Sequence, residues 1–164
     1  MNKSLRFILK SPFRGFSLIE LVVIIVLIGI FGTLAMTRTR DGLSTIREQI
    51  AIDQIISDID LARSMAFAKN ETITIVFSIS EESYTVYKGP DNNRTAISEF
   101  PNSNNGLISL DNSMIKDVDI KSVNFDDSNE LQFLPLGDLK SGGIITLNTK
   151  RISMEPVTGK WSIY

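Results

Sequence analysis

One carboxylic acid, Glu20, stands alone among the apolar side chains of residues 16–36. A charged side chain in a membrane segment costs up to about 3 kcal/mol at mid-depth of a bilayer, and less near its edge. A residue with such a cost is by default functional, and it requires a partner. Glu20 is therefore the first candidate for chemistry in this chain, and the chemistry is the neutralisation of a positive charge in a medium of low dielectric constant.

The apolar run from Phe16 to Met36 has 21 residues and no formal charge besides Glu20. This length is sufficient for a helix that crosses a bilayer core, which needs about 20 residues. The preceding residues, 1–15, contain no acid and four cations: Lys3, Arg6, Lys10 and Arg14. By the positive-inside rule we expect a single-pass membrane protein whose basic leader is cytoplasmic and whose C-terminal body lies on the other side of the membrane.

Two simpler interpretations of this segment stay open. The first is a secretory signal peptide cut after Thr33-Leu34-Ala35, although its apolar region would have about 7–15 residues and this run is longer. The second is a plain single-pass anchor without processing. Neither interpretation gives a reason for Glu20.

The string Arg14-Gly15-Phe16-Ser17-Leu18-Ile19-Glu20-Leu21 resembles the processing signal of type IV prepilins and type II secretion pseudopilins. The resemblance implies that a prepilin peptidase cuts between Gly15 and Phe16 and that Phe16 becomes N-methylated. A glycine at the cut permits close approach of the peptidase to the backbone. The resemblance also implies that Glu20 pairs with the ammonium of its own Phe16 or that of the next subunit, which would favour correct assembly.

Behind the apolar segment, residues 37–70 predict an amphipathic continuation of the helix that covers a globular body. We expect Asn70 to cap its end and Gly42 to mark a bend or a local break. The apolar positions at helical spacing are Leu43, Ile46, Ile50, Ile55, Ile56, Ile59, Ala62 and Ala66.

From residue 71 the apolar period changes from 3.6 to 2, so residues 71–164 predict a globular β domain. Residues 80–82 read as a hairpin turn, and residues 89–93 and 101–106 read as loops. The fold class is thus α+β, with a long pilin-type helix packed on antiparallel strands. The expected strands are 72–77, 83–87, 107–110, 114–124, 130–134, 144–149, 151–155 and 160–164.

Three later segments resemble the H-type minor pseudopilins and their relatives in fimbrial biogenesis. They are residues 61–67 with the strand that follows, residues 131–137, and residues 143–147 with 158–160. This resemblance implies a two-sheet β domain and a structural subunit near the tip of a periplasmic pseudopilus. The implied partners are other pseudopilins, contacted through the N-terminal helix, and the prepilin peptidase. The alternative is a minor type IV pilin for fimbrial biogenesis or DNA uptake.

Other kinds of chemistry find little support in the composition. The chain has no cysteine and no histidine, and with a net charge of −2 its residues after the leader carry −6. We therefore expect no enzyme activity, cofactor, metal or small-molecule substrate. Residues 126–130 could hold calcium, but a solvated turn is the simpler interpretation. Lys150, Arg151 and Lys160 are too few for nucleic-acid binding in an acidic body. Trp161 and Tyr164 are expected to complete a core strand or to pack at an interface.

Overall fold

The computed structural model describes residues 15–156 and 158–164, with the backbone alone at residues 37–41. The chain has two compact units, Met1–Arg40 and Asp41–Tyr164. The predicted leader therefore lies outside the described residues except for Gly15.

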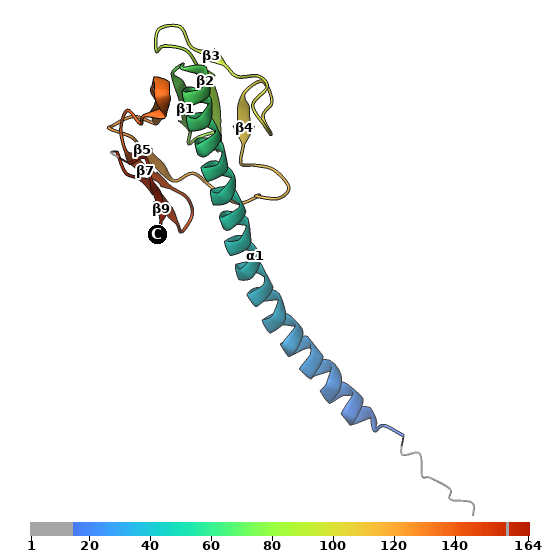
Figure 1. Cartoon of the computed structure of the whole chain (residues 1–164). Helices are drawn as coiled ribbons and strands as arrows, with labels where there is room; N and C mark the ends of the chain where they lie inside the picture. The colour runs from blue at the N-terminus through green and yellow to red at the C-terminus, as the bar shows by residue number, and fades with distance from the viewer. Residues whose placement is uncertain (1–14, 157) are drawn as a thin grey trace, which may run out of the picture. The chain divides into compact units, whose positions relative to one another are not determined.

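A single helix, α1 (Leu18–Lys69), contains both the apolar segment and the predicted amphipathic segment (Figure 1). No proline occurs between Pro12 and Pro90, so nothing in this stretch removes a helical hydrogen bond. The helix continues through Gly42, and the predicted local break is absent. It ends at Lys69, and the next residue, Asn70, has a φ of 52°, which is the left-handed conformation of a helix cap, as predicted.

The domain covers only one face of α1, and this corrects the predicted apolar stripe. Leu43, Ile46 and Ile50 were expected to cover the domain, but they are 46%, 57% and 41% exposed. At 3.6 residues per turn they lie opposite the buried stripe, because the expected pattern combined two faces of the helix. The buried apolar stripe consists of Ala51, Ile52, Ile55, Ile56, Ile59, Ala62 and Ala66.

The first sheet is antiparallel, with β1 (Ile73–Ser78) between β2 (Ser83–Lys88) and β6 (Glu130–Phe133). The register Ser78↔Ser83 places the hairpin turn at residues 79–82, where the sequence predicted a turn. Two short strands, β3 (Thr95–Ala96) and β4 (Leu107–Ser109), extend β2 on its other side. β3 was not predicted, because two residues between polar loops show no alternation.

The second sheet has the order β5-β7-β8-β9, and all of its pairs are antiparallel. Gly143 permits β5 and β7 to approach closely, since an added Cβ would lie 2.2 Å from the Asn124 carbonyl oxygen. The strands are β5 (Ser122–Asn124), β7 (Gly143–Thr146), β8 (Arg151–Met154) and β9 (Trp161–Ile163).

The predicted strand 114–124 is wrong over most of its length, because only residues 122–124 pair as β5. The preceding residues form a loop instead. The Asn112 side chain accepts hydrogen bonds from the backbone N–H groups of Met114 and Ile115, and Asp117 has a φ of 70°. Ile115, Val118 and Ile120 are still buried, so the apolar residues reach the core without a strand.

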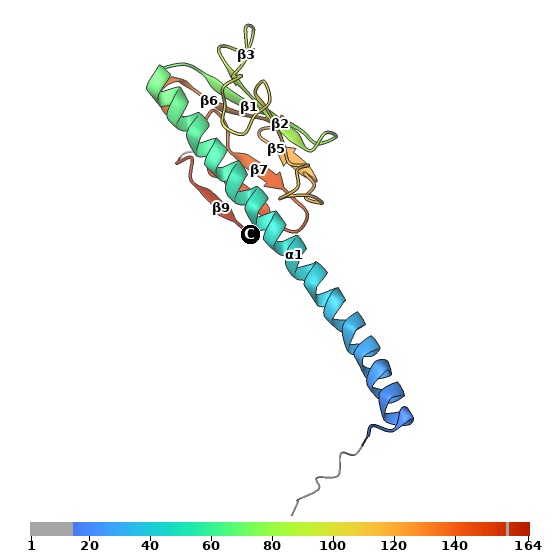
Figure 2. The ribbon, with the colours of Figure 1, turned by 90° about the vertical axis from the view of Figure 1, so that its right-hand side faces the viewer.

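The core lies between α1 and the two sheets, and Figure 2 shows the C-terminal half of the helix crossing both. Phe77 of β1 packs against Tyr84 of β2 and against Phe125, with ring centroids 5.4 and 6.2 Å apart. Trp161 and Tyr164 do not complete this core, since they are 36% and 76% exposed. The fold is therefore the predicted α+β architecture with two antiparallel sheets.

Two buried carboxylates of α1 join the helix to the sheets. Glu48 accepts hydrogen bonds from the backbone N–H groups of Thr149 and Lys150, at 2.6 and 2.9 Å, and from the Thr149 hydroxyl. Asp58 accepts one from the Tyr84 hydroxyl at 2.6 Å. Both residues are at most 5% exposed. A charged residue between the apolar positions of a helix normally faces water, so the burial of these two carboxylates is not apparent from the sequence.

The pKa values of the two carboxyls move in opposite directions for a physical reason. Burial raises the pKa of both groups, because it disfavours the charged form. At Glu48 the hydrogen bonds from Thr149 and Lys150 outweigh burial, so its pKa is lowered. At Asp58 the hydrogen bond from Tyr84 does not outweigh burial, so its pKa is raised. Ionised Glu48 therefore stabilises the fold, whereas ionisation of Asp58 opposes folding.

Replacing Glu48 tests this assignment. Glu48→Gln presents an amide to two backbone donors, so it should lower the free energy of unfolding at pH 7 by about 2 kcal/mol. Because the folded-state pKa is lowered, the stabilisation is present above pH 4.5 and is lost as the pH falls through the folded-state value. Urea unfolding, followed by the fluorescence of Trp161, measures the difference. Exposed Glu81→Gln is the control, and an equal loss at pH 3 and pH 7 would contradict the assignment.

Replacing Asp58 should change the free energy of unfolding in the opposite direction. Asp58→Asn keeps an acceptor for the Tyr84 hydroxyl and removes the charge, so at pH 7 it should raise the free energy of unfolding. The raised pKa means that wild-type stability falls as the pH rises above 3.8, the ordinary value of this group. The advantage of the variant should therefore vanish below pH 3.8. A variant that is less stable than wild type at pH 7 would refute the sign.

Candidate processing and assembly site

The residues that precede α1 are open to solvent. Gly15, Phe16 and Ser17 have no helical or strand structure, and Phe16 is 76% exposed. A Cβ added at Gly15 would meet no atom within 4 Å. The chain itself thus has room for a side chain at residue 15, and a requirement for glycine there must come from a molecule that binds this segment.

Glu20 lies in the first turn of α1. The backbone N–H groups of Glu20 and Leu21 donate to the Ser17 carbonyl at 3.0 and 3.2 Å, so Ser17 occupies the cap position. Ser17 and Glu20 have the spacing of a capping box, which is a sequence signal for the start of a helix that was not among the predictions above. A carboxylate here is also favoured by the positive end of the helix dipole. Helix formation therefore fixes Glu20 one turn beyond Phe16.

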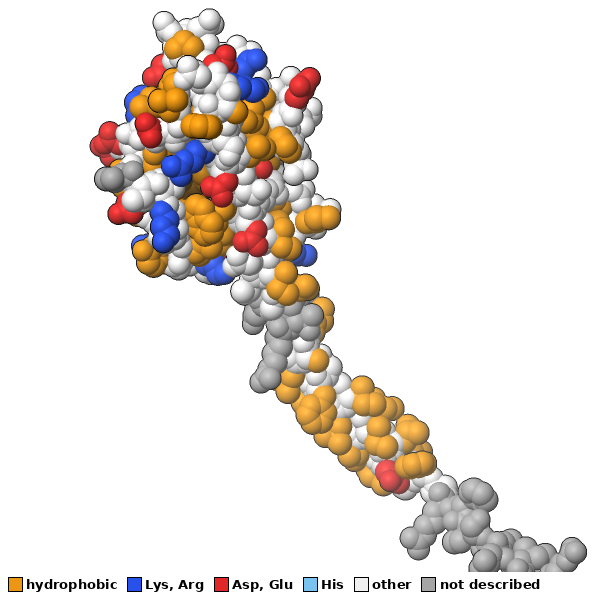
Figure 3. All heavy atoms as spheres, in the orientation of Figure 1, with side chains coloured by type: hydrophobic (Ala, Val, Ile, Leu, Met, Phe, Trp, Pro, Cys, Tyr) orange, Lys and Arg blue, Asp and Glu red, His pale blue; other side chains and the backbone are white. Residues whose placement is uncertain are grey.

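The segment after Glu20 presents apolar side chains on every side. Residues Leu18–Met36 form a stretch of 19 residues that could cross a membrane by length and composition, and none of it is buried. Figure 3 shows hydrophobic side chains covering this segment. A shallow hollow of about 400 Å³ near its start is lined by Phe16, Leu21, Ile24 and Ile25. Such a surface needs either lipid or other apolar helices around it.

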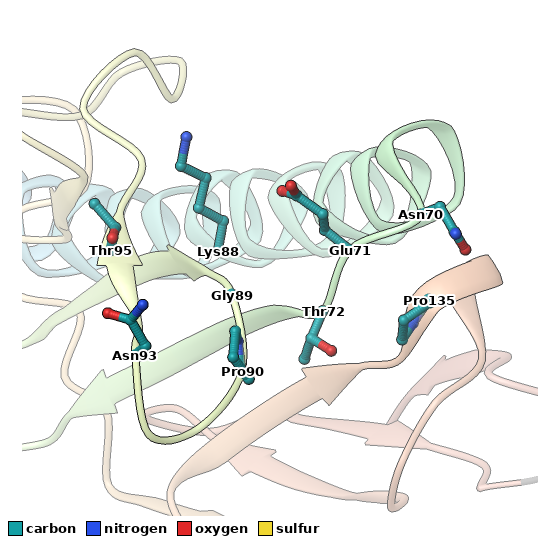
Figure 4. Close-up of a pocket in the computed structure, with 9 residues that line it drawn as sticks. All are labelled: Asn70, Glu71, Thr72, Lys88, Gly89, Pro90, Asn93, Thr95 and Pro135. Atoms are coloured by element: carbon teal, nitrogen blue, oxygen red, sulfur yellow. The ribbon is translucent and has the colours of Figure 1, made fainter.

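A polar pocket of about 400 Å³ lies where α1 ends. Figure 4 shows Glu71 and Lys88 pointing to the same side of the strands. Among the described residues no group of three or more metal-binding side chains occurs, here or elsewhere. The pocket is lined by Asn70, Glu71, Thr72, Lys88, Gly89, Pro90, Asn93, Thr95 and Pro135.

The polar loop beside this pocket is held by Arg94. Its guanidinium donates to Asp91 and Glu130, at 2.7 Å each, and Gln132 also donates to Asp91. The hydrogen bonds from Arg94 and Gln132 lower the pKa of Asp91 to about 2. These contacts fasten the loop to the first sheet, so they have a structural role.

The oxygen-rich segment 126–130 is a hydrogen-bonded turn. The Asn129 amide donates to the Phe77 carbonyl, and the Ser128 hydroxyl accepts from the Glu130 backbone. Of the basic group, Lys150 donates to Gln49 of α1, while Arg151 and Lys160 are exposed. The turn and Lys150 thus have local structural contacts.

Comparisons with known proteins agree with this geometry. Residues 10–36 match the model of the prokaryotic N-terminal methylation motif. Residues 51–162 match the family model described as type II transport protein GspH. No curated protein and no solved structure matches the chain. The first match contains Gly15, Phe16 and Glu20, and the second contains both sheets except for Ile163, the last residue of β9.

Proposed function

The chain belongs to the family of type II transport protein GspH, and we propose that it is cut between Gly15 and Phe16, N-methylated, and assembled into the pseudopilus through Glu20. Family membership makes it a minor pseudopilin of type II secretion, as the sequence predicted. The role of the protein is thus structural. Other pseudopilins and the prepilin peptidase are the partners that the family implies.

One observation carries the processing proposal: the methylation motif and the GspH domain occur in one chain and share α1. The first turn of this helix begins two residues beyond Phe16. A cut before Phe16 would leave the helix whole, whereas a signal-peptide cut after Ala35 would remove its apolar segment. The exposed Gly15 supports a cut at this position, because nothing in the chain obstructs access to its backbone.

We assign Glu20 to assembly because its carboxylate has no ion-pair partner among the residues that the structure describes, while the cut creates a new ammonium on Phe16. In an apolar surrounding an unpaired carboxylate is costly, and pairing removes most of that cost. Pairing with the ammonium of a neighbouring subunit would favour the register in which both charges are neutralised. Loss of the carboxylate should therefore weaken assembly and leave cleavage intact.

Before assembly the protein is held by its single span, with the basic leader in the cytoplasm and the β domain in the periplasm. The four cations of the leader support this orientation in the inner membrane. The cut removes these cations together with the leader. The processed chain, residues 16–164, can then move from the bilayer into the pseudopilus.

The cut is tested by intact mass and N-terminal sequencing of the protein purified from a host with its prepilin peptidase. We expect a methylated Phe16 as the first residue. Gly15→Val should leave most of the chain unprocessed, because a β-branched side chain obstructs the scissile backbone, while the helix content stays unchanged. Ser11→Val, within the leader, is the control. A chain that starts after Ala35 would overturn the proposal.

The assembly role is tested by Glu20→Ala, with the isosteric Glu20→Gln beside it. Both variants should be cut and methylated normally. Both should appear in sheared pseudopili on the order of tenfold less often than wild type, which corresponds to about 1.4 kcal/mol. Immunoblots of membrane and fibre fractions measure the ratio. Normal incorporation of the alanine variant would remove Glu20 from the mechanism.

A further inference from the structure

The second sheet ends in an open edge at β9. The sheet order makes β9 its last strand, and Figure 2 shows β9 and β5 on opposite sides of β7. Arg151 of β8 and Tyr164 exchange two backbone hydrogen bonds of 3.0 Å each. At the other end of the ladder the backbone N–H of Glu155 donates to the Lys160 carbonyl. β9 therefore offers an edge of five residues, 160–164.

The ladder determines which backbone groups of β9 face the open edge. In an antiparallel pair of strands, hydrogen-bonded and non-hydrogen-bonded residue pairs alternate. Tyr164 forms a hydrogen-bonded pair with Arg151, so Ser162 also directs its N–H and C=O toward β8. The N–H and C=O groups of Trp161 and Ile163 therefore point to the open edge. These four groups have no backbone partner among the residues that the structure describes.

The edge of β9 differs from that of β6, the last strand on one side of the first sheet. The outer edge of β6 is covered by the chain that follows it, since the Lys140 N–H donates to the Gln132 carbonyl at 2.9 Å. Such cover, a proline or a bulge commonly protects an edge, because unpaired backbone groups recruit other strands. Residues 160–164 contain no proline, and the register of β9 with β8 is continuous. β9 can thus accept a further strand.

The side chains around this edge indicate the chemistry of that strand. Trp161 and Tyr164 are exposed, and they line a hollow of about 500 Å³ together with Met154 and other residues of β8 and β9. Surface aromatic side chains of this kind are enriched at protein interfaces. Arg151 and Lys160 are exposed, and they form no ion pair within the described part of the chain. A strand that carries an acid beside apolar residues complements both features.

We propose that the edge of β9, residues 160–164, is an interaction surface that adds an extended segment of another pseudopilin to the second sheet. The segment pairs with the outward backbone groups of Trp161 and Ile163 and places a carboxylate opposite Lys160. This contact rests on the proposed function, because it requires subunits that assemble in one fibre.

The small size of the edge selects a fellow subunit as the partner. Each backbone hydrogen bond formed there replaces one made with water, so four of them give little net affinity. A partner that diffuses freely is therefore bound weakly. A subunit already held in the same fibre has a much higher effective concentration, and the same few hydrogen bonds then suffice.

A proline tests the backbone contact in the full-length chain, expressed in its own secretion host. Ile163→Pro removes an N–H at the open edge and none from the ladder with β8, and proline is tolerated at such edge positions. Ile163→Ala is the matched control, because it shortens the same side chain and keeps the N–H. At equal urea midpoints, followed by circular dichroism, incorporation into sheared pseudopili should be at least tenfold lower for the proline variant. Equal incorporation of the two variants would refute the contact.

Photo-crosslinking gives a measurement that does not depend on the stability of the proline variant. A photo-reactive benzophenone amino acid replaces Ser162 or, as the control, Ser122, an exposed serine of β5 at the opposite edge of the same sheet. After irradiation of sheared pseudopili, mass spectrometry should identify adducts between residue 162 and a peptide of another pseudopilin that carries an acid beside apolar residues. We expect at least a tenfold higher yield from residue 162 than from residue 122.

Three results would overturn the edge contact alone, given wild-type protein in the fibre. They are equal yields at both positions, adducts joining two copies of β9, and adducts to an exported protein in place of a pseudopilin. Absence of the processed wild-type chain from sheared pseudopili would instead overturn the proposed function, and the contact with it.

Discussion

The domain can cover α1 on one face only, and the rest of the structure follows from this constraint. Two sheets of short strands must place their apolar side chains against a single stripe from Ala51 to Ala66. Apolar side chains that do not reach the stripe, such as that of Tyr164 just after β9, remain exposed. On the opposite face of the helix, Leu43, Ile46 and Ile50 remain exposed.

Hydrogen bonds, and not apolar contacts alone, determine which face is covered. Near the beginning of the domain half, Glu48 ties the turn between β7 and β8 to α1, across about a hundred residues of sequence. Because apolar packing is non-directional, a helix with isoleucines on two faces could be covered on either. The three donors to Glu48 exist on one side only, so they remove that ambiguity and leave Ile46 and Ile50 outside.

The sequence predicted the parts of the fold where a local pattern determines the structure. Alternation located β1 and β2, and the hairpin turn at residues 80–82 followed from its polar residues. Prediction failed where contacts between residues far apart in the sequence determine the local structure or the buried face. Leu43, Ile46 and Ile50 have the same spacing as the buried stripe, and only the three-dimensional position of Thr149 shows that they face outward. Likewise, Asn112 turns the backbone of residues 114–121 into a loop, although their apolar residues suggested a strand.

The residues of the candidate processing and assembly site were predictable from the sequence, but their roles are not tested by the structure. Gly15, Phe16 and Glu20 were found from a short motif, since processing depends on a peptidase that reads local sequence. Their roles stay predictions, because the atoms that would act on them belong to other molecules. The spacing of Ser17 and Glu20 is that of a capping box, so the cap at Ser17 was also predictable from the sequence.

Three carboxylates on one helix illustrate how the partner of a charged side chain determines its effect. Glu48 accepts hydrogen bonds from several donors of its own chain, so its ionised form stabilises the fold. Asp58 accepts a hydrogen bond from the Tyr84 hydroxyl alone, so its ionisation opposes folding. Glu20 has no ion-pair partner among the described residues, and under the proposed function its partner is the ammonium that the cut creates. Under the proposed function, pairing of the Glu20 carboxylate with the ammonium of a neighbouring subunit favours transfer of α1 from lipid into the pseudopilus.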